Sequence, residues 1–397
     1  MPKLLQINVV ANSGSTGKIA EQIGRLALSN GWESYMAYGR GTPSSELELI
    51  RIGNDLGVKW HALQTRFFDN HGLASRVATK QLIQRIESIQ PDIIHLHNIH
   101  GYFLNYKILF EFLARYDKPI VWTLHDCWAF TGHCAFFDFK ACEKWRTHCN
   151  NCPSKFSYPS SFFIDRSSRS FDEKRLSFLL PNNITLVPVS EWLNRLLLDS
   201  FLSKIPTRVI HNGVDTDIFT GVSTSQQNHT FRIISVANNW SEPRKGLKDF
   251  FDLRNRLSSE YSITLVGLTD KEVNKLPDGI TGITRTSNQH ELASLYANAD
   301  LFVLPSYEDN FPSVILESLA SGTPVVAYDT GGCSEAVNRQ VGIIVPKGDM
   351  DALTDAIVSM RINPISRAVC RNWAESHFNN KICFNAYFEL YNDLLSK

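Results

Sequence analysis

The sequence has no excess of charge of either sign and no long hydrophobic run. Lys and Arg together number 40, as do Asp and Glu, which gives a formal net charge of +0. A protein that depends on nucleic-acid binding usually has a basic excess, so we expect no nucleic-acid partner. No apolar stretch is long enough to span a bilayer, and the short apolar run at the N-terminus continues into a Gly/Ser turn, unlike a signal peptide. We therefore expect a cytoplasmic protein that is at most peripheral to the inner membrane.

Strand-like apolar segments alternate with amphipathic helical segments along almost the whole chain, which is typical of parallel α/β architecture. The 397 residues suffice for two domains with cores of their own. The pattern predicts two Rossmann-like domains with parallel sheets that face each other across a cleft, where ligands tend to bind. The expected strands are LLQINVVA, ESYMAYG, DIIHLHN, PIVWTLHD and ITLVPVS in the first half, and FRIISVAN, SITLVGL, DLFVLPS, TPVVAYD and GIIVP in the second.

The same pattern gives the approximate limits of the domains, of two helices and of an insertion. We expect an N-terminal domain over residues 1–205, a second domain over 206–376 and a C-terminal helix over 377–397, with the polar segment 221–230 near the junction. Within the first domain, helices are expected from about Lys18 to Ser29 and from about Thr79 to Gln90. Residues 127–172 are rich in Cys, Ser and aromatic side chains and interrupt the α/β alternation, which indicates an insertion.

The most informative segment is SYEDNFPSVILESLASGTPVVAYDTGG, which begins at Ser306. Pro312 or Ser313 can open a short helix after the strand DLFVLPS, and Gly322 can end it. The free amides of such a helix N-terminus favour phosphate. About one turn in, Glu317 can accept hydrogen bonds from both hydroxyls of a ribose, or it is simply a surface glutamate. Asn310 and Phe311 complete this candidate nucleotide-binding segment, together with Pro312 and Ser313.

Arg244 and Lys245 lie between a predicted strand and a predicted helix, where two adjacent cations could neutralise a diphosphate leaving group. The alternative is a pair of solvated loop residues.

Glu308, Asp309 and Glu317, followed by SGTPVVAYDTGG, resemble the paired-glutamate motif of the family 4 glycosyltransferases, which have the GT-B fold. That family usually places seven residues between its two glutamates. Here eight residues separate Glu308 from Glu317 and seven separate Asp309 from Glu317, so either Glu308 or Asp309 fills the first position, near the donor sugar. Lys245 with Gly246 resembles the family's diphosphate-binding Lys-Gly pair. Arg244 could substitute for an arginine that the family carries a few residues earlier.

In the first domain, NSGSTGKIAEQIG fails the nucleotide P-loop template, because Asn12 replaces a required glycine and Ile19 a required Ser or Thr. We expect a flexible turn from Gly14 through Thr16 to Gly17 that allows close approach to a phosphate or sugar. The resemblance implies that this loop reaches the donor. It also implies that His125, at the end of a strand, lies near the transferred sugar.

The segment PDIIHLHNIHGYFLN resembles a bacterial subset of this family that assembles exopolysaccharides of the colanic-acid type. Its His97, Asn98 and His100 are expected on the acceptor side. A metal pair of His95 and His97 is the alternative, although no third ligand is apparent. The segment KWHALQTRFFDNHG, from Lys59 to Gly72, mixes aromatic and cationic residues. It could contact lipid or a lipid-linked acceptor, or form a helix packed over the sheet.

Cys134, Cys142, Cys149 and Cys152 form a C-x7-C-x6-C-x2-C arrangement. Four thiols could close a tetrahedral structural zinc site, and in a reducing compartment metal is favoured over disulfides. Disulfides and free thiols remain alternatives, and Cys127 and His133 could compete as ligands. The bacterial subset carries a similar cysteine-rich insertion, which implies a structural role.

Taken with the resemblance, the sequence implies a retaining glycosyltransferase of GT-B fold, with an N-terminal acceptor domain, a C-terminal donor domain and a final helix that crosses back to the first domain. It would move a hexosyl-type sugar from a nucleotide-diphospho-sugar to a glycan or lipid-linked acceptor in bacterial surface polysaccharide synthesis, without a cofactor for the transfer itself. The alternatives are a GT-B nucleotide-sugar epimerase and a non-catalytic nucleotide-sugar-binding protein.

Overall fold

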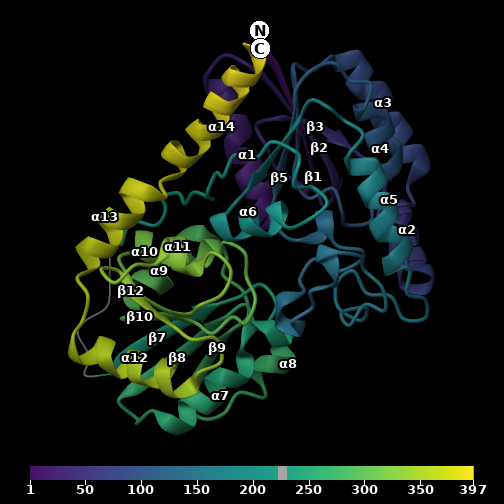
Figure 1. Cartoon of the computed structure of the whole chain (residues 1–397). Helices are drawn as coiled ribbons and strands as arrows, with labels where there is room; N and C mark the ends of the chain where they lie inside the picture. Colours follow the sequence, from purple (N-terminus) through teal and green to yellow (C-terminus); the bar gives the residue numbers. More distant parts are fainter. Residues whose placement is uncertain (222–229, 397) are drawn as a thin grey trace. The chain divides into compact units, whose positions relative to one another are not determined.

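The computed structural model describes residues 1–221 and 230–396, in two compact units (Figure 1). Unit 1 comprises Met1–His211 with Phe384–Lys397, and unit 2 comprises Asn212–Cys383. The boundary therefore falls a few residues after the expected 205. The polar segment expected at the junction lies almost entirely outside the described residues. Of the described helices, none is both long and apolar enough to cross a membrane.

Unit 1 is a parallel sheet of six strands in the order β3-β2-β1-β4-β5-β6. This is the strand order of a Rossmann fold, in which the direction of the chain's progress reverses between β1 and β4. The strands are β1 (Lys3–Val10), β2 (Glu33–Arg40), β3 (Glu48–Arg51), β4 (Ile93–Leu96), β5 (Ile120–Leu124) and β6 (Ile184–Pro188). The helices are α1 (Gly14–Ser29), α2 (Asp55–Phe68), α3 (Arg76–Ile89), α4 (Tyr106–Leu113), α5 (Ser167–Phe178) and α6 (Glu191–Leu198).

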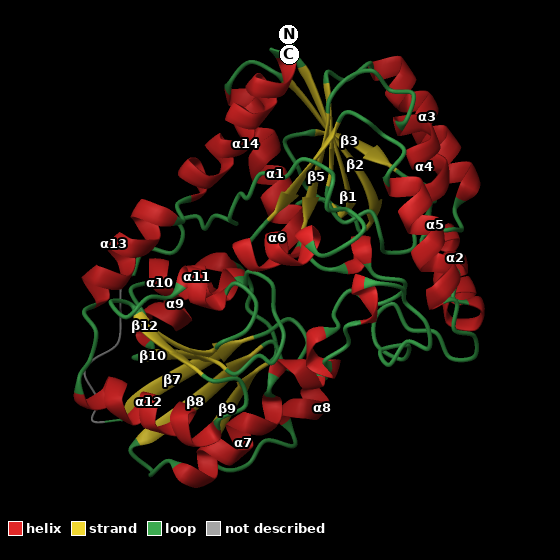
Figure 2. Cartoon of the chain, viewed as in Figure 1, coloured by secondary structure: helices red, strands yellow, loops and turns green. Residues whose placement is uncertain are grey.

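Unit 2 repeats the same topology, with the order β12-β11-β10-β7-β8-β9 and the reversal between β7 and β10. Its strands are β7 (Phe231–Val236), β8 (Tyr261–Val266), β9 (Ile280–Ile283), β10 (Leu301–Leu304), β11 (Val325–Tyr328) and β12 (Gly342–Val345). Its helical segments are η4 (Pro243–Lys245), α7 (Leu247–Arg256), α8 (Asp270–Val273), α9 (Gln289–Asn298), α10 (Ser313–Ala320), α11 (Cys333–Ala336), α12 (Met350–Ile362) and α13 (Arg367–His377). In Figure 2, helices flank the strands of each unit.

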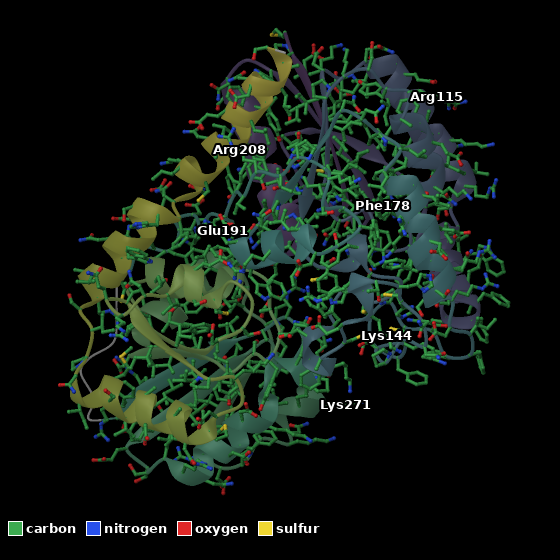
Figure 3. The ribbon with its side chains drawn as sticks, viewed as in Figure 1. Arg115, Lys144, Phe178, Glu191, Arg208 and Lys271 are labelled. Carbon is green, nitrogen blue, oxygen red and sulfur yellow. The ribbon has the colours of Figure 1, made fainter. Side chains whose placement is uncertain are left out.

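The central strands are apolar because both faces of each sheet are covered. Every residue of β4, β5, β10 and β11 is buried, as expected for parallel sheets between helical layers. The core of unit 1 includes Trp122 on β5 and Phe178 on α5, whose rings meet edge to face at 4.9 Å (Figure 3). The predicted α/β class with two Rossmann-like units is confirmed.

The last helix, α14 (Asn380–Leu395), begins in unit 2 and continues into unit 1, which the chain rejoins at Phe384. Within unit 1, the Trp32 ring lies 5.0 Å from that of Phe388, and the Thr123 hydroxyl donates to the Tyr387 hydroxyl at 3.1 Å. Arg208 forms an ion pair with Glu389 at 3.2 Å (Figure 3). Aromatic packing and hydrogen bonds thus fasten this helix to the sheet of unit 1.

Several predicted helix starts and the predicted end of the insertion differ from the structure. α1 begins at Gly14 and not at Lys18, so the residues expected to form a flexible turn are the first turn of the helix. α3 begins at Arg76, three residues before the expected Thr79, and α5 begins at Ser167, inside the expected insertion. Residues 127–166 otherwise contain only the 3₁₀ turns η1 (Trp128–Phe130), η2 (Asp138–Lys140) and η3 (Lys144–Arg146). The short strands β3 and β9 were not predicted.

Candidate functional site

The candidate site of unit 2 lies where the loops after β7 and β10 meet. The Lys245 ammonium contacts the Asp309 carboxylate at 2.6 Å. Arg244 donates to the backbone carbonyl of Glu308 at 2.8 Å, and its own carbonyl accepts from the Tyr307 amide at 2.7 Å. Because β7 and β10 flank the point where the strand order reverses, these contacts lie at the position where open α/β sheets bind ligands.

Two glycines allow these loops to approach so closely. Gly246 has φ +73°, and a Cβ there would lie 2.2 Å from the carbonyl oxygen of Pro305. Gly331, in the loop after β11, has φ +55°, and a Cβ would lie 1.7 Å from the carbonyl oxygen of Asp309. A side chain at either position would therefore push the loop after β10 away. The loops that follow three neighbouring strands form one packed unit around Asp309.

The two candidate acidic residues have different surroundings. Burial alone would raise the pKa of Asp309, but Lys245 and Arg244 together hold that pKa below its usual value, so the carboxylate is ionised at neutral pH. Arg244 also pairs with Glu242 at 2.6 Å. Glu308 is only 2% exposed, and its backbone carbonyl accepts from Arg244. Asp309 contacts Lys245 directly, and Arg244 lies near enough to help lower its pKa.

Helix α10 begins at Ser313, and its N-cap residue is Pro312, whose side chain makes no capping hydrogen bond. Phe311 is buried just before the helix, and Asn212 donates to its carbonyl at 3.2 Å. Glu317 is half-buried and accepts a hydrogen bond from the Tyr296 hydroxyl at 3.2 Å. Glu317 is thus partly withdrawn from solvent and oriented by a neighbour, unlike a freely exposed glutamate. Tyr296, which sequence reasoning missed, holds this carboxylate in place from α9.

In unit 1, the candidate residues follow β1, β4 and β5. Gln6 donates through its Nε2 to the carbonyl of Ala20 at 2.8 Å, so its Oε1 faces His97 Nε2 at 3.0 Å. His97 Nδ1 in turn lies 3.3 Å from His125 Nε2. An amide oxygen only accepts, so His97 carries its proton on Nε2 and accepts at Nδ1. His125 then donates through Nε2 and has its Nδ1 as an acceptor.

Burial determines the charge of these histidines. It lowers the pKa of His125 to about 4 and that of His97 well below its usual value. Both rings are therefore neutral at neutral pH. They suit hydrogen bonding to a neutral hydroxyl and do not provide a positive charge.

The loops after β1 and β4 are joined through Asn8. Its side chain accepts from the backbone amide of Asn98 at 3.2 Å and donates to the Thr16 hydroxyl at 3.4 Å. Gly17 is buried, and a Cβ there would lie 3.0 Å from Val10 Cγ2, whereas a Cβ at Gly14, which has φ +60°, would meet nothing. The structure thus brings Thr16 and Asn98 to the same edge of the sheet.

His100 contacts Asp126 Oδ2 through Nε2 at 2.9 Å and the Tyr158 hydroxyl through Nδ1 at 2.9 Å. Burial raises the pKa of Asp126, but His100, the backbone amide of Trp128 and His125 together outweigh this, and the net shift is downward. His95 is fully buried between the hydroxyls of Thr123 and Tyr391, at 2.7 and 2.6 Å. His95 therefore fastens α14 to the sheet, which argues against a metal pair with His97.

The four clustered cysteines line one small cavity together with His133 and Trp145. Cys134 and Cys152 are hydrogen-bonded, and this contact lowers the pKa of the Cys152 thiol to about 7. Lys144 bridges to the carbonyls of Asn150 and Asn151 (Figure 3). All eight cysteines are free of disulfides. Among the described residues, no group of three or more His, Cys, Asp or Glu side chains is arranged to hold a metal ion, and the structural zinc stays a prediction.

A second feature that sequence reasoning missed is an open groove of about 870 Å³ in unit 1. It lies between α2, α3 and the start of α4, and its lining includes Trp60, Ser75, Arg76, Asn105 and Lys107. Volumes of this size are typical of ligand sites. No sequence motif marks it, because the lining comes from several helices.

Two sequence families match the chain. The family described as Glycosyltransferase Family 4 matches residues 19–218, and the family described as Glycosyl transferases group 1 matches residues 230–362. Because the first match alone spans half of the chain, the protein belongs to glycosyltransferase family 4. It is a glycosyltransferase, as predicted.

Individual relatives agree with this assignment. A colanic acid biosynthesis glycosyl transferase of Escherichia coli (strain K12), WcaC, is 24% identical over 87% of this chain and 88% of its own length. An MMP alpha-(1->4)-mannosyltransferase of Mycolicibacterium hassiacum is 30% identical over 48% of each chain.

Solved structures share the fold. Sucrose-phosphate synthase from Thermosynechococcus elongatus has a TM-score of 0.73 and 18% identity, covering 100% of both chains. Anabaena Alr3699/HepE, in complex with UDP-glucose, has a TM-score of 0.66 and 16% identity, covering 99% of this chain and 100% of its own. The predicted GT-B fold is confirmed.

Proposed function

We propose that the protein is a retaining glycosyltransferase that takes a hexosyl-type sugar from a nucleotide-diphospho-sugar. The observation that carries this proposal is the contact of Lys245 with Asp309 at the strand reversal of unit 2, in the loop that leads into the N-terminus of α10. An ionised carboxylate, two cations and a helix N-terminus suit a ligand that combines a sugar with a diphosphate.

The donor is held in three parts. Glu317 accepts hydrogen bonds from the two ribose hydroxyls, since it is half-buried and already oriented by Tyr296 at 3.2 Å. The diphosphate lies against Lys245, Arg244 and the first amides of α10, which neutralise its charge without a metal cofactor. The segment from Asn310 to Ser313 surrounds the sugar-phosphate junction.

Asp309 takes the position near the donor sugar that the sequence left open between two residues. In the free protein it balances Lys245. When the diphosphate supplies a stronger negative charge, Lys245 turns toward it and Asp309 accepts a hydrogen bond from a sugar hydroxyl instead. Glu308 is only 2% exposed, which favours Asp309 for this position.

Transfer needs no protein nucleophile in this proposal. The bond between the anomeric carbon and the phosphate oxygen breaks, and the electron pair leaves with the diphosphate, whose charge Lys245 and Arg244 stabilise. The acceptor hydroxyl attacks the oxocarbenium-like carbon from the same face and passes its proton to the departing phosphate oxygen. His125 accepts a hydrogen bond from a sugar hydroxyl at its Nδ1, because its Nε2 proton is directed to His97.

The acceptor is a glycan or a lipid-linked oligosaccharide of bacterial surface or exopolysaccharide synthesis, bound by unit 1. The colanic acid relative covers 87% of the chain and supports this class of acceptor. His97 and Asn98 lie at the carboxyl edge of that sheet. A lipid-linked acceptor implies a protein that works in the cytoplasm, peripheral to the membrane.

The proposal is tested first by thermal unfolding in the presence of a panel of UDP- and GDP-sugars, since a bound donor stabilises the fold by mass action. The stabilising donor is then incubated with lipid extracts containing undecaprenyl-linked acceptors, and the anomeric configuration of the product is read by NMR. An axial product from an axial donor linkage supports retention, and an inverted product contradicts it. Rapid donor isomerisation without acceptor would favour the epimerase instead.

A further inference from the structure

Exposed apolar side chains are concentrated in two short segments of unit 1. Half of the large hydrophobic side chains that the described residues expose belong to two short segments, residues 56–77 and 156–164. These segments include Trp60 and every exposed phenylalanine of the described chain except Phe139. Soluble proteins rarely gather exposed aromatic side chains in this way unless the surface binds something.

The first segment includes helix α2, which exposes an apolar stripe on the side opposite its buried residues. Along α2, Leu56, Trp60, Leu63 and Phe67 recur at the spacing of one helix face and are 76, 60, 43 and 42% exposed. The buried residues of α2 are His61 and Thr65, which lie on the other side of the helix. The exposed stripe therefore does not pack this helix onto its own sheet.

The second segment is fastened beside this stripe. The Phe163 ring stacks on that of Phe67 at 5.3 Å, with 22° between the planes. The backbone amide of Phe162 donates to the carbonyl of Arg66, at the end of α2, at 2.8 Å. Phe163 itself is 69% exposed. We call the exposed surface formed by Leu56, Trp60, Leu63, Phe67 and Phe163 the α2 face.

The charges around the α2 face are mostly positive. Residues 55–80 and 153–166 contain six Lys or Arg and three Asp, whereas the whole chain has net charge +0. Of the three carboxylates, Asp69 and Asp165 are bound to backbone amides and Asp55 to Arg51. Lys59 and Arg66 are exposed and lie two turns apart along the same side of the stripe.

We propose that the α2 face docks onto an anionic lipid bilayer. Exposed aromatic side chains along one side of a helix, flanked by cations, suit insertion at the headgroup level, where the rings enter the interface and the cations meet lipid phosphates. This proposal rests on the proposed function in one respect. The lipid-linked acceptor of the transfer lies in the same bilayer that the α2 face contacts. Trp60 of this face also lines the groove of unit 1.

The test is co-sedimentation of the full-length protein with vesicles of phosphatidylcholine alone and of phosphatidylcholine mixed with phosphatidylglycerol. Two variants change the α2 face at exposed positions: Trp60→Ser with Phe163→Ser, and Lys59→Glu with Arg66→Glu. Their matched controls change equally exposed residues elsewhere. Leu198→Ser with Ile362→Ser replaces side chains that are 56 and 70% exposed, and Lys204→Glu with Lys248→Glu reverses two exposed cations.

The native protein and both controls should bind the mixed vesicles and bind phosphatidylcholine at least several-fold more weakly. The aromatic variant should lose binding to both vesicles by roughly tenfold or more, and the charge-reversal variant should lose the preference for the anionic vesicles. Binding that is unchanged in both variants, or that falls equally in the controls, overturns the proposal. A change in oligomeric state on light scattering without vesicle binding would overturn it in favour of a protein interface.

The donor panel separates this proposal from the proposed function. Stabilisation by a nucleotide-sugar should be the same in the α2-face variants and the native protein, since the donor residues lie in unit 2. Donor binding without vesicle binding refutes only the docking surface. Vesicle binding without donor binding refutes only the glycosyl transfer.

Discussion

The contact between Lys245 and Asp309 provides a prediction with separable effects on folding and on catalysis. The variant Lys245→Met removes the ammonium but keeps most of the side-chain volume. The two side chains are only 17 and 16% exposed, so the change leaves the Asp309 carboxylate largely desolvated without its partner. Loss of one partner of a buried pair costs about 3–5 kcal/mol, and for this partly exposed pair we expect about 2–3 kcal/mol. At about 2–4 °C per kcal/mol, the midpoint of thermal unfolding should fall by roughly 4–12 °C.

Lys245→Met should also slow transfer, and this loss should not be reversed by a second substitution that restores stability. Removing one charge that stabilises the departing diphosphate should lower kcat about 10²–10³-fold. Adding Asp309→Asn to Lys245→Met removes the orphaned charge, so stability should recover, while transfer should not. Lys248→Met, at an exposed position in the same segment, serves as the control. Transfer rates are measured with the donor that the panel identifies. Recovery of transfer in the double variant would refute the role of Lys245, since its effect would then be one of folding alone.

Three further predictions follow. Glu317→Gln keeps the contact with Tyr296 but loses the charge. It should weaken donor binding, measured by calorimetry, by about 1.5–3 kcal/mol. The control Asp351→Asn, at an exposed helix position, should leave donor binding unchanged. Gly331→Ala should displace the loop at Asp309, where a Cβ would lie 1.7 Å from a carbonyl oxygen, and should abolish transfer at low temperature while the far-UV circular dichroism stays native; full activity would refute the packed-loop interpretation. Because burial lowers the pKa of His125 from 6.5 to about 4, the unfolded state binds more protons between these values, so this residue's contribution makes stability rise with pH from about 4 to about 6.5. The native protein should lose more stability on acidification across this range than His125→Gln in urea titrations, and equal losses would contradict the buried neutral histidine.

The fold was largely predictable because the central strands can be recognised from their local sequence alone. Strands buried on both faces are continuous apolar runs such as DLFVLPS, and these stand out against the helical spacing around them. The edge strands β3 and β9 have four residues each and contain polar or small residues, as in ELIR and ITGI. Their pairing with β2 and β8 comes from the tertiary fold and not from a local pattern.

The candidate site was predictable in its residues but not in its contacts. Lys245 and Asp309 are 64 positions apart, and only the reversal of strand order between β7 and β10 brings them together. The sequence therefore left Glu308 and Asp309 as alternatives, whereas the structure joins the Asp309 side chain to Lys245 and buries Glu308. Tyr296 was missed because a tyrosine in an ordinary helix carries no functional signal.

The helix start at Gly14 was missed for a physical reason. Two glycines and two small hydroxyl residues over Gly14–Gly17 have low helix propensity, which favours a loop on local grounds. The tertiary fold reverses this preference, because Gly17 lies where a Cβ would press on Val10. The glycine serves close packing of helix on strand at this position, and flexibility is not required.

Unit 2 should bind the nucleotide diphosphate of a sugar donor through Lys245 and Glu317. Calorimetric titration with UDP and with GDP measures this binding in the native protein, in Lys245→Met with Asp309→Asn, in Glu317→Gln and in the Lys248→Met control. One of the two nucleotides should bind the native protein and the control with equal affinity and should bind the other two variants at least tenfold more weakly. Equal affinity in all four proteins, or no binding of either nucleotide by the native protein, would exclude this role of the two residues.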